Sequence, residues 1–202
     1  MSTPQPAGLT HDEQQILLSL ARASIRAAVL GEPLPGNLLA DLPPSLFQPA
    51  ACFVTLLGAD TGELRGCTGV LRAQLPLVEE VIRTAAQTAL CDPRFPPVSP
   101  EELDALRIEI SVLTTPQPLE YSSPDEIPER LRPGIDGVTL IHRGLHRATF
   151  LPQVWDKIAD PIEFLDRLSM KMGLPPGAWR RPGIAVEIYQ VQEFGETERA
   201  EE

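Results

Sequence analysis

Prolines divide this chain into short segments and limit what it can fold into. Of its 202 residues 22 are proline, and many of these lie in three stretches, residues 32–50, 91–97 and 114–133. Proline fixes its backbone φ angle and has no N–H to donate, so such stretches interrupt helices and sheets. We therefore expect several short helices and strands joined by well-defined loops, rather than long uninterrupted elements.

Three segments carry the signals of helices. The pair Thr10 and Glu13 forms a capping box, which predicts a helix over about 20 residues, 10–30. Apolar residues at helical spacing predict a second helix over 75–90. Asp160, followed by a proline and then by a glutamate three positions on, predicts the start of a third helix.

Runs of apolar residues at strand spacing predict two hairpins and two single strands. The hairpins are expected over 51–71 and 138–151, each with a turn that contains glycine. The single strands are expected over 106–113, where apolar and polar residues alternate, and over 184–191. The order hairpin, helix, strand therefore occurs twice along the chain.

This repeated order suggests an internal duplication, with related halves over 51–113 and 137–191. Under this hypothesis Thr149 takes the place in the second half that Cys67 holds in the first. The offset between matching segments drifts along the chain, so chance alternation of apolar residues is the alternative. An overlay of the matched strands distinguishes the two.

Charge and cysteine content narrow the class of protein. The formal net charge is −11, which argues against a nucleic-acid partner, because phosphates require a basic surface. No apolar run approaches the roughly 20 residues of a membrane-spanning helix, and no secretory signal is evident. Three cysteines cannot all pair internally, which favours a reducing, cytoplasmic setting. Residues 1–9 and 195–202 are predicted to be loose ends.

A candidate site lies in the segment 64–69. If this segment is extended, Arg65 and Cys67 share one face of the strand, and a cation near a thiol favours the nucleophilic thiolate. Gly66 and Gly69 remove side chains beside them, as happens where a strand bulges or where something approaches the backbone. The alternative is that Cys67 is a small buried residue required for packing.

Two further sets of residues join the candidates. Asp92 and Arg94 lie in a proline-rich loop, where Arg94 could grip an anionic substrate; alternatively, both residues tether a turn while Phe95 fills the core. Glu109 and Glu187 lie on the polar faces of their strands. They could act as an acid–base pair if they converge, although glutamates on a solvated sheet face are far commoner.

Common metal and phosphate motifs are missing from the sequence. The three cysteines are separated by 14 and 23 intervening residues, and the three histidines are scattered. This spacing gives no reason to expect a metal site. Neither glycine-rich phosphate-binding loop occurs. The residues therefore predict no metal and leave the cofactor open.

Five motifs, in order, resemble those of the AMMECR domain family, whose bacterial and archaeal branch is called AmmeMemoRadiSam system protein A. The motifs lie at 64–69, 92–103, 110–113, 132–137 and 147–155. The resemblance extends over residues 10–194. Thr68 stands where the family has isoleucine, which makes the core side of the first motif more polar, and Met172 stands where it has alanine.

The resemblance implies an α+β fold, a single compact unit of two related hairpin–helix–strand halves around a mixed, barrel-like sheet. It also implies a pathway shared with a Memo-like protein and a radical SAM protein, because the family's genes often lie beside theirs. Two hypotheses stay open. One is an enzyme or enzyme component, with a pocket near Cys67 and Arg65 that binds or transforms an anionic small molecule. The other is a non-catalytic adaptor that docks the two partner proteins.

The candidate site on the first hypothesis combines a nucleophile with binding residues. Neither a nucleic-acid nor a membrane partner is expected, and the oligomeric state is not predicted. The candidate nucleophile is Cys67, and the candidate binding residues are Arg65, Gly66, Gly69, Asp92, Arg94, Glu109 and Thr149.

Overall fold

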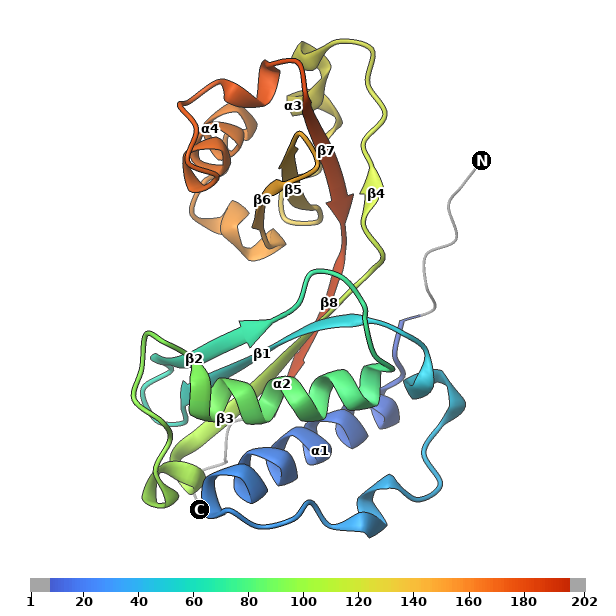
Figure 1. The fold of residues 1–202 in the computed structure, drawn as a ribbon, viewed down its shortest axis with the longest axis vertical. Helices are drawn as coiled ribbons and strands as arrows, with labels where there is room; N and C mark the ends of the chain where they lie inside the picture. Colours follow the sequence, from blue (N-terminus) through green and yellow to red (C-terminus); the bar gives the residue numbers. More distant parts are fainter. Residues whose placement is uncertain (1–7, 197–202) are drawn as a thin grey trace. The chain divides into compact units, whose positions relative to one another are not determined.

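A computed structural model gives the structure of residues 8–196 and divides the chain into two compact units (Figure 1). The first unit is Met1–Leu113 with Gln192–Glu202, and the second is Thr114–Val191. Within residues 8–196, no helix is both long enough and apolar enough to cross a membrane.

The first unit is a four-stranded sheet with two helices packed on one face. The strand order is β2-β1-β3-β8, and α1 and α2 lie side by side against the sheet (Figure 1). The elements are α1 (His11–Leu30), η1 (Gly36–Leu39), η2 (Pro44–Phe47), β1 (Ala51–Gly58), β2 (Leu64–Gly69), α2 (Leu77–Cys91), η3 (Pro100–Ala105), β3 (Leu106–Leu113) and β8 (Val191–Gly195).

Helix α1 begins and ends at the residues whose types signal the ends of a helix. The N–H of Glu13 donates to the Thr10 hydroxyl, and the Thr10 N–H donates to the Glu13 carboxylate at 2.7 Å. Gly31 ends the helix with a φ angle of 69°, which favours glycine. The predicted helix over 10–30 is therefore confirmed.

The second unit has its own sheet and its own core. The strand order is β4-β7-β5-β6. Trp155 stacks on Phe164 with 3.7 Å between ring centroids, and Trp179 is buried in the same cluster. The elements are β4 (Gln117–Pro118), η4 (Pro124–Glu126), α3 (Ile127–Arg130), β5 (Gly137–His142), β6 (His146–Phe150), η5 (Pro152–Asp156), α4 (Pro161–Lys171), η6 (Ala178–Arg180) and β7 (Ile184–Tyr189).

The proline-rich stretch 114–133 was expected to be a loop that interrupts helices and sheets, and this prediction is wrong. It contains β4 and two short helical turns, and Ile127 and Leu131 are buried in the second core. Isolated apolar residues between prolines have no periodicity, so no pattern in the segment indicates that they are buried.

The α+β class is confirmed, but the sheet differs from the expected one. The strands form two four-stranded sheets in which neighbouring strands run antiparallel, rather than one mixed, barrel-like sheet. Each sheet keeps two edge strands, β2 and β8 in the first and β4 and β6 in the second. Closure into a barrel removes such edges, so neither sheet is a barrel.

The two sheets correspond in strand order and register. In each, a central strand (β1 or β5) pairs with its hairpin partner on one side and with a later strand on the other. In both registers a threonine of the central strand lies between a cysteine or threonine and a glutamate. The two rows are Cys67–Thr55–Glu109 and Thr149–Thr139–Glu187. This correspondence supports the internal duplication, which stays a prediction until the matched strands are overlaid.

Both ends of the described chain are held in the first unit. The Leu9 N–H donates to Gln192 Oε1 at 2.7 Å, and Gln192 Nε2 donates to the Leu9 carbonyl at 2.9 Å. Glu196 forms an ion pair with Arg22 of α1. The prediction of loose termini is therefore wrong at Leu9 and Glu196. Most of its remainder lies outside the described residues.

Candidate functional site

Cys67 lies on strand β2, on the face of the first sheet that points away from the helices. It pairs in register with Thr55, while the neighbouring Gly66 approaches Thr88 of α2 on the opposite face. Cys67 is half-buried, and Thr55 Oγ1 donates to Cys67 Sγ at 3.3 Å. All three cysteines of the chain are free thiols.

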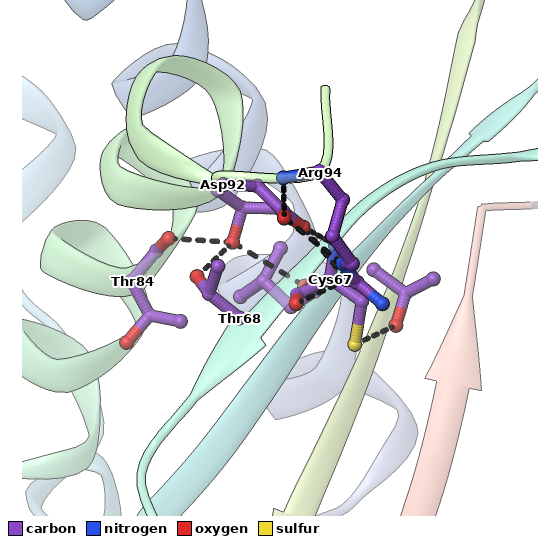
Figure 2. Close-up of polar contacts among 8 residues, drawn as sticks. Cys67, Thr68, Thr84, Asp92 and Arg94 are labelled. Carbon is purple, nitrogen blue, oxygen red and sulfur yellow. Dashed lines mark hydrogen bonds and ion pairs between the residues drawn. The ribbon is translucent and has the colours of Figure 1, made fainter. Parts of the chain in front are cut away.

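Asp92 and Arg94 hold both backbone polar groups of Cys67 at the free edge of β2. The Cys67 N–H donates to Asp92 Oδ2 at 2.8 Å, and Arg94 Nη2 donates to the Cys67 carbonyl at 2.9 Å (Figure 2). Because β2 is an edge strand, these two contacts occupy groups that would otherwise be open to pairing with another strand. We call this arrangement the Asp92–Arg94 clamp.

The clamp is also an ion pair. Arg94 Nη2 lies 2.7 Å from Asp92 Oδ2, and Arg94 Nε lies 3.0 Å from Oδ1. The Asp92 side chain is 3% exposed, whereas that of Arg94 is 53% exposed. Hydrogen bonds from Arg94 hold the pKa of Asp92 well below its usual range. The same hydrogen bonds raise the pKa of Arg94, and the neighbouring Cys67 adds to this effect.

Arg65 has a carboxylate partner of its own. Its guanidinium bonds both oxygens of Glu102, at 2.7 Å and 3.1 Å, and these bonds lower the pKa of Glu102. Leu57 pairs with Leu64, and the preceding residue of β1 pairs with Gly66, so Arg65 is the extra residue of a β-bulge. The simple alternation that placed Arg65 and Cys67 on one face therefore does not apply.

Phe95 lies between the two arginines rather than in the core. Its ring centre is 6.0 Å from the guanidinium carbon of Arg65 and 5.5 Å from that of Arg94. These distances fall within the range of cation–π contacts. Phe95 is half-buried, so the expectation that it fills the core is wrong, and Val98, three residues later, is buried in the core instead.

The two glycines of the motif allow close approach of neighbouring groups. A Cβ atom on Gly69 would lie 2.4 Å from the Cys52 carbonyl oxygen and 2.5 Å from the Phe53 ring. A Cβ atom on Gly66 would lie 3.1 Å from the Thr88 methyl group. The groups that pack against the backbone therefore explain why Gly66 and Gly69 carry no side chain.

Thr68 points toward α2. Its hydroxyl lies 2.6 Å from the hydroxyl of Thr88, which in turn donates to the Thr84 carbonyl at 2.8 Å (Figure 2). The polar residue at this position is thus satisfied by a hydroxyl on the facing helix, at a place where an isoleucine would make only apolar contact.

The remaining candidates are placed by the sheets. Glu109 lies in the same row as Thr55 and Cys67, and its Oε1 is 3.3 Å from Arg107 Nη2. The pKa of Glu109 is raised, first by burial and second by the negative charge of Glu193.

The other two candidates, Glu187 and Thr149, belong to the second unit. Glu187 Oε2 is 3.6 Å from Arg147 Nη1, and the Thr149 hydroxyl donates to the Val138 carbonyl. Within residues 8–196 no three His, Cys, Asp or Glu side chains gather in a way that could hold a metal ion.

Sequence reasoning missed Thr55, which contacts the sulfur of Cys67 most directly. Its signal was available in the predicted hairpin: the register set by the turn places Thr55 opposite Cys67. It also missed the pairing of Arg65 with Glu102, which are 37 positions apart, so that no local pattern links them.

Comparison with known proteins agrees with the motifs. The AMMECR1 family model matches residues 18–194. A protein from Methanothermobacter thermautotrophicus is 42% identical over 194 residues, which cover 94% of this chain and 97% of that protein. One from Thermofilum pendens is 40% identical over 203 residues, covering 94% and 92%. The crystal structure of an uncharacterized protein from Pyrococcus horikoshii matches with a TM-score of 0.82 at 35% identity, covering 94% of both chains. This chain belongs to the AMMECR1 family.

Proposed function

We propose that this AMMECR1-family protein uses Cys67 as a nucleophile or carrier thiol for a small molecule that bears an anionic group. The observation that carries the proposal is the Asp92–Arg94 clamp, which fixes the backbone of Cys67 at both its N–H and its carbonyl. The thiol itself accepts a hydrogen bond from the Thr55 hydroxyl. The half-exposed guanidinium of Arg94 supplies positive charge close to the sulfur.

A thiol held in this way suits acyl transfer. The sulfur attacks the carbonyl carbon of an activated acyl group and forms a thioester. The leaving group departs with the electron pair of the bond that breaks, and the thiol proton passes to solvent or to the leaving group. No oxidant or reductant is required. Arg94 would orient a carboxylate or phosphate of the same substrate, because half of its side chain stays exposed beside Asp92, whereas the Arg65 side chain is only 18% exposed and is bound to Glu102.

The setting of this reaction rests on the family resemblance. We place the protein in a cytoplasmic modification pathway together with a Memo-like protein and a radical SAM protein. The three free thiols are compatible with a reducing compartment.

Replacing Cys67 in the organism that carries the gene tests the proposal. Cells with Cys67→Ser are expected to accumulate the same small molecules as cells without the gene, as measured by untargeted mass spectrometry of extracts. Cys91→Ser is the matched control, because Cys91 is exposed and lies outside the clamp. A metabolite profile of Cys67→Ser cells that equals wild type, when deletion changes the profile, would contradict the proposed role.

A non-catalytic adaptor is the second candidate, and one observation favours it. The charged groups of the motif pair with one another, Asp92 with Arg94 and Glu102 with Arg65. This is the arrangement expected if they only stabilise the fold. On this account Cys67→Ser leaves the metabolite profile unchanged. The tagged protein then recovers the Memo-like and radical SAM proteins from native lysate, and Cys67→Ser recovers them equally well.

A further inference from the structure

A second cation in the molecule binds a strand in the way that Arg94 does. Lys171, the last residue of α4, donates from Nζ to the Thr149 carbonyl at 2.9 Å and lies 5.1 Å from the centre of the Phe150 ring. Thr149 belongs to β6, one of the two edge strands of the second sheet. The chain has 15 arginines and only two lysines, Lys157 and Lys171.

The first unit shows what completes this arrangement. There Arg94, which follows α2, donates to the carbonyl of Cys67 at 2.9 Å, and Cys67 holds the register position that Thr149 holds in the second sheet. The carboxylate of Asp92 then bridges the Cys67 N–H and the guanidinium. The Cys67 backbone, the Arg94 guanidinium and the Asp92 carboxylate therefore each bond the other two.

The second unit has the strand and the cation but no carboxylate. Among residues 8–196, no carboxylate forms an ion pair with Lys171. Partial burial of its ammonium group lowers the pKa of Lys171, and no neighbouring charge offsets this effect.

The backbone N–H of Thr149 points to the same free edge of β6 as the Thr149 carbonyl. In an antiparallel pair the N–H and carbonyl of one residue point to the same side of the strand. Because the Thr149 carbonyl meets Lys171 at the free edge of β6, its N–H points to that edge as well, and it has no acceptor among the described residues. The hydroxyl of Thr149 is turned inward, where it bonds Thr139 and the Val138 carbonyl.

We propose that Lys171 Nζ and the Thr149 N–H form a binding site for the carboxylate group of a small molecule. The ligand carboxylate takes the position relative to β6 that the Asp92 carboxylate takes relative to β2. The site lies within the second unit and goes beyond the function proposed for Cys67, on which it does not depend.

Nuclear magnetic resonance tests the site with sodium acetate as the probe. The intact chain, labelled with ¹⁵N and with ¹³C-lysine, is titrated at pH 7 with acetate, and sodium chloride at equal ionic strength is the reference. The Lys171 ¹³Cε signal and the Thr149 amide signal are expected to move along one saturating curve. The exposed Lys157 is the internal control, and its signal is expected to stay in place.

Two variants complete the test. Lys171→Met is expected to abolish the saturating response of the Thr149 amide. Lys171→Arg keeps a cation of the kind that the first unit uses, and is expected to retain that response even if the methionine variant folds poorly. A response that does not saturate, that chloride reproduces, or that Lys157 shares would overturn the proposal. Since the readout is in the second unit, a negative result leaves the role of Cys67 untouched.

Discussion

Replacing Asp92 with alanine is expected to lower the free energy of unfolding by about 2–3 kcal/mol. The variant leaves the Cys67 N–H without its acceptor and Arg94 without its buried counter-ion. Because the guanidinium is half-exposed, water replaces part of what Arg94 loses, so the effect stays below the roughly 3–5 kcal/mol expected when a fully buried pair is broken. Urea unfolding at pH 7 measures the change.

Asp104→Ala is the matched control for this prediction. Asp104 is exposed on η3 of the same unit, and its replacement is expected to change the free energy of unfolding by less than about 0.5 kcal/mol. Equal stability of Asp92→Ala and Asp104→Ala would show that the clamp contributes nothing to the fold.

The Asp92 effect is also expected to depend on pH. The pKa of Asp92 in the folded protein lies below its unfolded value of about 4, first because of the hydrogen bonds from Arg94. A lowered pKa adds stability that is fully present above the unfolded value and is lost as pH falls toward the folded value. The difference in stability between wild type and Asp92→Ala should therefore be constant from pH 7 to about 5 and shrink below about 4.

Gly69→Ala is expected to destabilise the protein by about 2–3 kcal/mol, again measured by urea unfolding. The added methyl group would overlap the Cys52 carbonyl oxygen and the Phe53 ring, at 2.4 Å and 2.5 Å. Both groups belong to β1, which is paired on both sides, so they cannot easily move away. The strand end two residues after Cys67 would have to shift instead.

Gly36→Ala provides the comparison for Gly69→Ala. A Cβ atom on Gly36 meets no atom within 4 Å, and its φ angle is ordinary. Its replacement is expected to be neutral or to stabilise the protein by up to about 1 kcal/mol, because alanine restricts the unfolded chain. If the two variants have the same stability, the close approach at Gly69 is not a constraint on the fold.

Local signals predicted most of the fold. The cap at Thr10 and the left-handed Gly31 set α1, and the alternation over 106–113 gave β3 with its observed bounds. The pairing between strands that are far apart in the sequence could not be predicted. The strand expected over 184–191 is two strands, β7 and β8, which pair in different sheets. The register of such pairing depends on partners far away in the sequence, as for Glu196 and Ile108, which are 88 positions apart.

The candidate site was predicted in part. Cys67, Asp92 and Arg94 are brought together, although the contacts are made by the backbone of Cys67, which no side-chain pattern encodes. Arg65 is turned toward Glu102 by a bulge, and Thr149 belongs to the second unit. Whether these residues bind a ligand stays a prediction.

The most direct test of the account is the rate at which iodoacetamide alkylates Cys67 in the folded protein, followed by peptide mass spectrometry at pH 7. Cys52 is the internal standard, because it is fully buried and burial raises its pKa to about 12. If Cys67 is the nucleophile, it is expected to be alkylated at least about 100-fold faster than Cys52 without unfolding. If Cys67 reacts no faster than Cys52, then it is alkylated only when the protein unfolds. In that case its thiol is structural and the proposed chemistry is wrong.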